Sequence, residues 1–159
     1  MKKFELTNEF VTNMFGTKLF RIRALVEFGD VEAGELGGYV EKESNLGHDD
    51  NAWVYGDARV YDNALVYDNA RVYGDAWVYG NARVCGDALV CGDARVCGNG
   101  DYAYAHGFGS VNRTTTFFRL KDGGVGVRCG CFYGTLAQFR DKIRETHGET
   151  KKAQEYLML

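Results

Sequence analysis

Apolar and polar positions recur with a period of six residues through the middle of the chain. Between Asp50 and Cys97 the sequence divides into eight consecutive hexads, each reading Gly/Asp, Asp/Asn, Ala, any residue, Val, Tyr/Cys. Ala and Val lie two residues apart, as Ala58 and Val60 do, so both point to one side of an extended strand. The polar pair that opens each hexad is typical of turns and tolerates positive φ. Each hexad is therefore predicted to form a short strand and a corner, and the copies must stack to bury a core.

The segment before the repeat contains a second kind of pattern. Residues 18–25 alternate, with Phe20, Ile22 and Ala24 on one side, which predicts a strand. Residues 36–40 lead into the repeat. Val40 and Leu46 are six residues apart and are expected to begin an irregular first coil.

The segment after the repeat predicts a hairpin and a helix. Residues 114–120 and 125–131 are two β-like runs on either side of a Lys-Asp-Gly-Gly turn. Thr135 and Gln138 form a capping-box pattern, which predicts that a helix begins there and ends near His147 and Gly148. The apolar face of this helix is expected to be Leu136, Phe139 and Ile143, and residues 151–159 indicate a second short helix.

The repeat resembles the hexapeptide repeat of left-handed parallel β-helices. In that family an aliphatic residue is followed four positions later by a small one, as Val54 is by Ala58 and Val60 by Ala64. The chain departs from the family in having Tyr or Cys, rather than Gly, directly after the aliphatic residue. The resemblance implies a mainly β fold in which three hexads make one coil. The expected organisation is an N-terminal β cap over residues 1–37, a β-helix over 38–110, and a C-terminal hairpin and helix over 111–159.

Three hexads per coil place residues 18 apart on neighbouring strands. We therefore expect Trp53 beside Arg71 and then Leu89, and Arg59 beside Trp77 and then Arg95. Tyr55 should meet Tyr73, and Tyr61 should meet Tyr79. The predicted binding surface is this aromatic and basic exterior, which comprises Trp53, Tyr55, Arg59, Tyr61, Arg71, Tyr73, Trp77, Tyr79, Arg83 and Arg95. Bases or nucleotides could stack on such a surface, or another subunit could pack on it.

Composition and charge exclude several other classes of protein. The 159 residues include 21 Gly and no Pro, and 14% are aromatic, which excludes collagen and Pro-rich disorder. The net charge of −3 gives the protein no strong overall electrostatic attraction to nucleic acid or membrane surfaces. No long apolar run predicts a transmembrane helix or a secretion signal, so we expect a cytoplasmic protein whose five cysteines are thiols. Cys85, Cys91 and Cys97 should lie on three different faces, too far apart for a disulfide.

Candidate catalytic and metal-binding residues are few. Hexapeptide acyltransferases, which the repeat resembles, usually carry a catalytic His, a protruding loop and a site between the subunits of a trimer. Here His48, His106 and His147 all lie outside the hexads, and His106 is the candidate general base. The γ-carbonic anhydrases, also built on this fold, need three His ligands that the repeat lacks. Cys129 and Cys131 are read as structural, the corner aspartates as corner hydrogen-bond acceptors rather than calcium ligands, and no metal or cofactor is expected.

Three functions stay open at this point. Residues 19–25, 37–43 and 128–132 resemble parts of uncharacterised hexapeptide-repeat proteins of bacteria, phages and prophages, which are often labelled acyltransferases from the repeat alone. The first function is a non-catalytic binding protein, such as a phage or mobile-element accessory that inhibits a host defence system by binding an effector or a nucleotide signal. The second is an acyltransferase that uses acyl-CoA, and the third is a structural or assembly module. A homotrimer is the family-like expectation.

Overall fold

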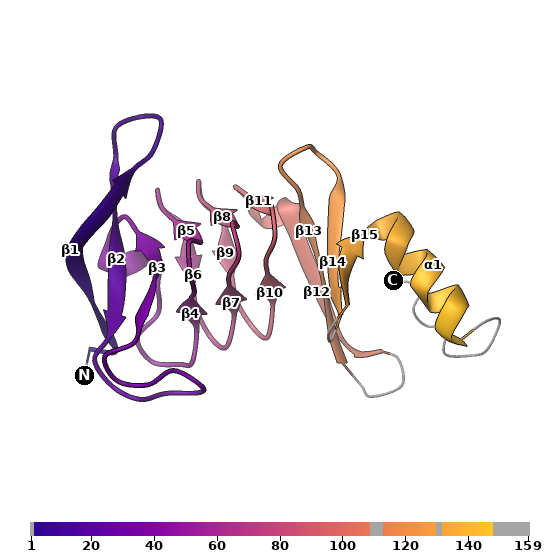
Figure 1. Cartoon of the computed structure of the whole chain (residues 1–159), viewed down its shortest axis with the longest axis horizontal. Coiled ribbons are helices and arrows are strands. Elements are labelled where there is room, and N and C mark those ends of the chain that lie inside the picture. The colour runs from indigo at the N-terminus through magenta and orange to yellow at the C-terminus, as the bar shows by residue number, and fades with distance from the viewer. Residues whose placement is uncertain (1, 109–112, 130–131, 148–159) are drawn as a thin grey trace.

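The protein is a β-solenoid closed by a β cap at each end. The computed structural model describes residues 2–108, 113–129 and 132–147. Figure 1 shows the N-terminal cap, the stacked coils and the C-terminal sheet with its helix in succession along the long axis. The predicted mainly β architecture, with a β-helix followed by a hairpin and a helix, is confirmed.

The N-terminal cap is an antiparallel sheet that continues into one face of the solenoid. Strands β1 (Phe4–Thr12) and β2 (Lys18–Ala24) form a hairpin, and β2 pairs antiparallel with β3 (Leu36–Val40). The predicted strand at 18–25 is confirmed, whereas β1 was not predicted because Phe4 is its only buried residue. Buried Lys3 ties the cap to the first coil, since its Nζ donates to the carbonyl oxygens of Asp50 and Ala52 at 2.9 and 2.6 Å.

Every hexad contributes one two-residue strand to the coils. The strands are β4 (Trp53–Val54), β5 (Arg59–Val60), β6 (Leu65–Val66), β7 (Arg71–Val72), β8 (Trp77–Val78), β9 (Arg83–Val84), β10 (Leu89–Val90) and β11 (Arg95–Val96). They make three parallel faces, with strand orders β3-β5-β8-β11, β4-β7-β10 and β6-β9. Residues 18 apart pair within each face, as Arg59 does with Trp77 and Trp77 with Arg95, so the predicted ladders are confirmed.

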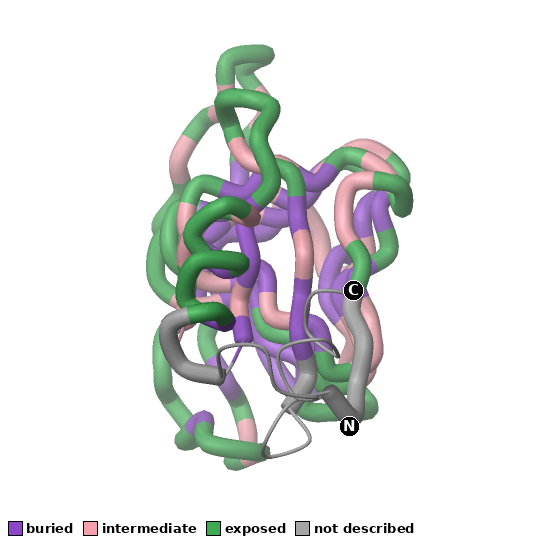
Figure 2. Tube along the Cα trace, turned by 90° about the vertical axis from the view of Figure 1, so that its right-hand side faces the viewer, coloured by how far each residue is buried: buried purple, intermediate pink, exposed green. Residues whose placement is uncertain are grey.

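The interior of the coils is filled by the Ala and Val of every hexad. All sixteen of these side chains, from Ala52 to Val96, are at most 1% exposed. Viewed along the long axis, the buried segments gather inside and the exposed ones lie outside (Figure 2). Val40 and Leu46 are also buried and lie beside Val60 and Val66, so the predicted irregular first coil is confirmed. The short helix η1 (Glu43–Asn45) lies between them, and its Asn45 amide donates to the Ala64 carbonyl oxygen at 2.8 Å.

The C-terminal cap is a four-stranded antiparallel sheet with one helix packed on it. After η2 (Asn99–Asp101), the sheet has the order β12 (Tyr102–Phe108), β13 (Arg113–Arg119), β14 (Val125–Cys129) and β15 (Phe132–Thr135). The predicted hairpin corresponds to β13 and β14. Residues 102–108 pair with β13 rather than with a coil, which differs from the expected β-helix boundary at 110.

Helix α1 (Leu136–His147) begins at the predicted capping box. The Thr135 backbone N–H donates to Gln138 Oε1 at 2.9 Å, and the Gln138 N–H donates to Thr135 Oγ1 at 3.2 Å. Phe139 and Ile143 are buried against Val127 and Cys129 of β14. The second helix predicted at 151–159 lies outside the described residues. Among the described residues, no helix combines the length and apolarity needed to cross a membrane.

Candidate recognition groove

The residues predicted to form one binding surface are distributed over all three faces of the solenoid. Arg59, Trp77 and Arg95 share one face, Trp53 and Arg71 share a second, and Arg83 stands on the third beside Leu65. The tyrosines lie at the strand ends in two separate ladders. Tyr55 meets Tyr73 edge to face at 6.3 Å between ring centroids, and Tyr61 stacks on Tyr79 at 5.2 Å.

Trp53 is not part of the exposed surface, so its expected position on the exterior is wrong. Its side chain is fully buried, because the N-terminal cap folds over the first coil. The Trp53 ring lies 5.2 Å from the Phe28 ring and 6.3 Å from the Phe4 ring, both edge to face. The repeat pattern alone predicts which side of the strand Trp53 occupies, but not that the cap covers it.

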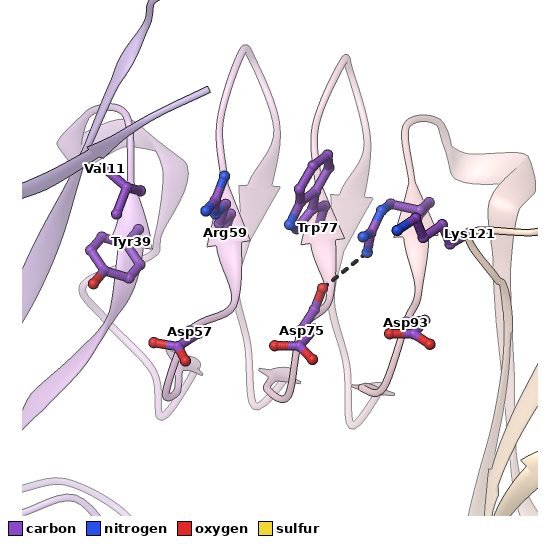
Figure 3. A pocket seen from close by; sticks show the side chains of 9 residues that line it. Val11, Tyr39, Asp57, Arg59, Asp75, Trp77, Asp93 and Lys121 are labelled. Carbon is purple, nitrogen blue, oxygen red and sulfur yellow. Dashed lines mark hydrogen bonds between the residues drawn. The ribbon is translucent and has the colours of Figure 1, made fainter. Parts of the chain in front are cut away.

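The face formed by β3, β5, β8 and β11 carries an open groove of about 410 Å³. The groove runs along the solenoid axis, from the N-terminal cap to the first residues of the C-terminal hairpin turn. Its lining combines aromatic, acidic and basic side chains: Val11, Tyr39, Asp57, Arg59, Asp75, Trp77, Asp93, Arg95 and Lys121. Figure 3 shows Asp57, Asp75 and Asp93 in a row below the row of Arg59 and Trp77.

A small apolar cluster outside the solenoid core lies beneath the groove. Leu19, Tyr39 and Tyr61 are buried there, and Val11, Trp77 and Tyr79 pack against them. Burial raises the pKa of Tyr61 to about 12. This cluster holds the aromatic rings of the groove in place, because they are packed on both the cap and the coils.

Trp77 is held between two arginines from the neighbouring coils. The guanidinium carbon of Arg95 lies 4.0 Å from the Trp77 ring centroid, and that of Arg59 lies 5.3 Å from it. Arg95 is fixed further, because its Nη1 donates to the carbonyl oxygens of Asp75 and Ala94, both at 2.9 Å. Figure 3 marks the bond to Asp75 with a dashed line. The predicted cation–π contacts are thus present at Trp77, each of a kind contributing about 0.5–1 kcal/mol at exposed sites.

The three aspartates occupy equivalent corner positions of successive coils. Asp57, Asp75 and Asp93 are all exposed. Asp57 Oδ1 lies 3.6 Å from Arg21 Nη2, at the cap end of the groove. Within the described part of the chain, the carboxylates of Asp75 and Asp93 have no hydrogen bond or ion pair. The groove therefore presents acceptors that its own residues leave free.

Arg21 contacts two of the residues that line the N-terminal end of the groove, Tyr39 and Asp57. Its guanidinium lies 4.4 Å from the centroid of the Tyr39 ring and is paired with Glu9. Its Nη1 also donates to the Gly37 carbonyl oxygen at 2.8 Å. Charge pairing and a backbone contact therefore hold Arg21 in place beside these two lining residues.

The histidine whose side chain is described, His48, packs in the N-terminal cap and does not line the groove. His48 accepts a hydrogen bond at Nδ1 from the Lys3 backbone N–H at 3.1 Å and stacks on Phe4 at 4.4 Å. Burial lowers the pKa of His48, which suits this acceptor role in the neutral form. His106 belongs to β12 in the terminal sheet, and His147 is the last residue of α1. Among the described residues, no cluster of three or more His, Cys, Asp or Glu is placed to hold a metal ion.

The cysteines of the last coil lie on separate faces, as expected from their spacing. Cys85, Cys91, Cys97 and Cys129 are free thiols. Cys129 is buried and accepts a hydrogen bond from Thr115 Oγ1 at 3.2 Å, which is a structural role. Its sequence neighbour Cys131 lies outside the described residues.

Sequence reasoning missed six of the residues that line the groove. The 18-residue period places Asp57, Asp75 and Asp93 in one row, so the spacing that predicts the Arg59–Trp77–Arg95 ladder could also have predicted this row. Tyr39 pairs with Arg59, which is 20 residues away, because the first coil is irregular. Val11 and Lys121 come from the two caps, and no repeat spacing relates them to the coils.

Comparison with known proteins supports the solenoid. The family model described as the YdcK beta solenoid repeat matches at residues 52–67, 58–74, 66–80, 76–92 and 82–98, which together cover less than half of the chain. A search of curated proteins finds no match. The repeat matches coincide with the stacked coils of the structure. The chain is a β-solenoid repeat protein.

Proposed function

We propose that this protein is a non-catalytic binding protein and that the groove on the β3-β5-β8-β11 face is its recognition site. The observation that carries the proposal is the pre-ordered Arg59–Trp77–Arg95 stack beside two free carboxylates. Trp, Tyr and Arg are the side chains most often responsible for binding energy at protein interfaces. A stack that is already ordered loses little side-chain entropy when a partner binds.

The charges of the groove favour a protein partner over a nucleotide or nucleic acid. Three cations, Arg59, Arg95 and Lys121, face three anions, the aspartates at positions 57, 75 and 93. A phosphate chain would meet the aspartates as well as the cations, and this repulsion opposes binding. In addition, arginines from both neighbouring coils lie over the Trp77 ring, so a base that stacks on this ring competes with them.

The biological setting of the proposal comes from the resemblance to phage and bacterial hexapeptide-repeat proteins. On that basis the protein is an accessory of a phage or mobile element that binds, and so inhibits, an effector of a host defence system in the host cytoplasm. The homotrimer stays a prediction. Exposed Tyr and Trp side chains on the faces of the solenoid would favour a trimer. Fewer of them are exposed than expected, because Trp53 is buried and Tyr61, Trp77 and Tyr79 pack against one another. An acyl-CoA transferase is not favoured, since no histidine is among the described residues that line the groove.

The proposal is tested by the recovery of a protein partner on immobilised protein. We expect the wild type to retain a host protein and Arg59→Glu to lose it, because reversal of this charge breaks the stack on Trp77. The matched control is Arg83→Glu, since Arg83 occupies the same position of its hexad on a different face and is exposed. A partner retained equally by both variants, or no partner at all, would contradict the proposal.

A further inference from the structure

We infer that the occupant of the groove is an α-helical segment of a partner protein with a stripe of basic side chains. This inference rests on the proposed function and deepens it by naming the kind of partner. It follows from three features of the groove: the spacing of its coils, the free hydrogen-bonding groups along it, and its bounded length.

The spacing of the coils matches the spacing of side chains along one face of an α-helix. Paired strands lie about 4.8 Å apart, so Asp75 and Asp93 lie about 4.8 and 9.6 Å from Asp57 along the axis. With a rise of 1.5 Å per residue, helix positions i, i+3 and i+7 lie at about 0, 4.5 and 10.5 Å. In an extended peptide the side chains on one side repeat about every 6.7 Å, and they lose register with the coils after one step.

The unpaired carboxylates and guanidinium donors in the groove indicate which charges a complementary helix would carry on each of its faces. The carboxylates of Asp75 and Asp93 have no partner within the described residues, so the row of aspartates fits Lys or Arg at i, i+3 or i+4, and i+7. Above this row, the Arg59 guanidinium lies over the Trp77 ring and has no hydrogen bond or ion pair within the described residues, so its outer donors fit an acidic side chain on the adjacent helix face (Figure 3). A ligand of one charge sign would be repelled by half of the groove.

The two caps limit how much helix the groove can hold. Val11 and Tyr39 stand at one end and Lys121 at the other, so three coils lie between them. Three coils span about 10–15 Å, which corresponds to two or three turns of helix at 5.4 Å per turn. The expected contact is therefore a short helical segment, as in other helix-in-groove complexes.

The test is selection from a display library of helix-forming peptides of about 18 residues, long enough to be helical in water. The selection uses the full chain as bait. We expect enriched peptides to carry Lys or Arg at i, i+3 or i+4, and i+7. The best peptide is then synthesised beside a peptide of the same composition whose basic residues are spread evenly around the helix. The spread peptide should bind at least tenfold more weakly by calorimetry.

Variants of the protein assign this binding to the aspartate row. Asp75→Asn should lower the affinity for the selected peptide by about two- to fivefold, as expected for the loss of one exposed ion pair. The matched control is Asp87→Asn, which changes the same hexad position at a different corner and should leave the affinity unchanged. Asp75→Lys should bind a peptide whose facing Lys is changed to Glu better than it binds the original peptide.

The inference is overturned if no helical period is enriched, if Asp75→Asn and Asp87→Asn behave alike, or if the groove retains neutral oligosaccharides on a glycan array and no helix. These outcomes are separable from a failure of the proposed function. A host partner that is lost by Arg59→Glu while no basic helix is selected contradicts only the inference. A partner retained equally by Arg59→Glu and Arg83→Glu contradicts the proposed function itself.

Discussion

At the scale of single residues, the first position of the hexad has two roles: it adopts a positive φ at the corner, and it can join adjacent coils by a hydrogen bond. Most hexads begin with a Gly of positive φ, but Asp62 and Asp68 adopt φ of 56° and 58° at the same position. Each of these aspartates accepts a hydrogen bond from the backbone N–H of a Gly in the next coil, at 3.1 Å from Gly80 and Gly86 respectively. The side chain thus joins adjacent coils and offsets the cost of the left-handed backbone.

Substitutions at Asp62 should separate these two contributions. Asp62→Ala keeps the unfavourable φ and loses the acceptor, so it should lower the free energy of unfolding by about 1–2 kcal/mol. Asp62→Gly loses the acceptor but adopts this φ without strain, so its loss should be less than half as large. Asp62→Asn is the control, because Asn also offers an oxygen acceptor and tolerates positive φ. Urea unfolding measures all three, and equal losses for Ala and Gly would show that the φ value carries no cost.

At the scale of elements, the change from Tyr to Cys along the repeat shows where the solenoid meets its cap. The last residue of the hexad is Tyr five times and then Cys three times. Each row of tyrosines ends on a cysteine, because Cys85, Cys91 and Cys97 follow Tyr67, Tyr73 and Tyr79 by 18 residues. Residues of the cap then occupy the adjacent space, as Tyr102 does with its hydroxyl 3.9 Å from Cys85 Sγ. A smaller side chain is needed wherever the cap contacts the outside of the last coil.

A tyrosine restored in this coil should therefore be tolerated only where the cap leaves space. Cys91 is 3% exposed, so Cys91→Tyr should overpack the junction and lower the free energy of unfolding by about 1–3 kcal/mol. Cys97→Tyr is the matched control, because Cys97 is exposed and continues the ladder of Tyr61 and Tyr79. Thermal unfolding of the two variants provides the comparison. If Cys97→Tyr lowers the stability more than Cys91→Tyr does, limited space at the contact with the cap does not explain the cysteines of the last coil.

The coils could be predicted from the sequence far better than the caps. Ala and Val at fixed spacing determine the interior, and the 18-residue period places Arg59, Trp77 and Arg95 in one ladder. No repeat identifies the strands of the caps, so only those with a clear local pattern, β2, β13 and β14, were predicted, and β1, β12 and β15 were not. The burial of Trp53 was missed for the same reason, since residues distant in sequence cover it.

At the scale of the whole molecule, both ends of the solenoid are closed by antiparallel sheets. The β2–β3 pair covers the first coil, and the C-terminal sheet rests on the last one. In that contact the Leu89 backbone N–H donates to Thr116 Oγ1 at 3.1 Å, and Tyr133 packs on the corner at Gly92, where a Cβ would lie 1.9 Å from its hydroxyl oxygen. Closed ends prevent coils of different molecules from pairing edge to edge.

The tyrosine ladders should make the fold sensitive to high pH. Burial raises the pKa of Tyr55, Tyr61 and Tyr73 to about 12, above the ordinary value of about 10. Their contribution to stability is complete below pH 10 and is lost as the pH rises toward 12, because the unfolded chain ionises first. Burial raises the pKa of Cys91 and acts in the same direction. Burial lowers the pKa of Lys3 to about 8 and acts in the opposite direction, adding stability as the pH rises from about 8 to 10.

Tyrosinate absorbance measures this behaviour directly. In the native protein we expect part of the ten tyrosines to ionise only as the pH approaches 12, together with a fall in the urea midpoint above pH 10. In urea all of them should ionise near the ordinary value of about 10. A single ionisation step near pH 10 with the fold intact would show that the ladders are open to solvent.

Every coil adds the same length along the axis, so the solenoid can lengthen or shorten by whole coils. An in-frame duplication of one coil would move the two caps apart by about 4.8 Å and add one aspartate and one ladder residue to the groove. Duplication of a single hexad would instead rotate the terminal sheet by one face and carry Lys121 away from the groove. Tandem copying in units of three hexads thus changes how long a partner helix the site can hold while both of its ends stay the same.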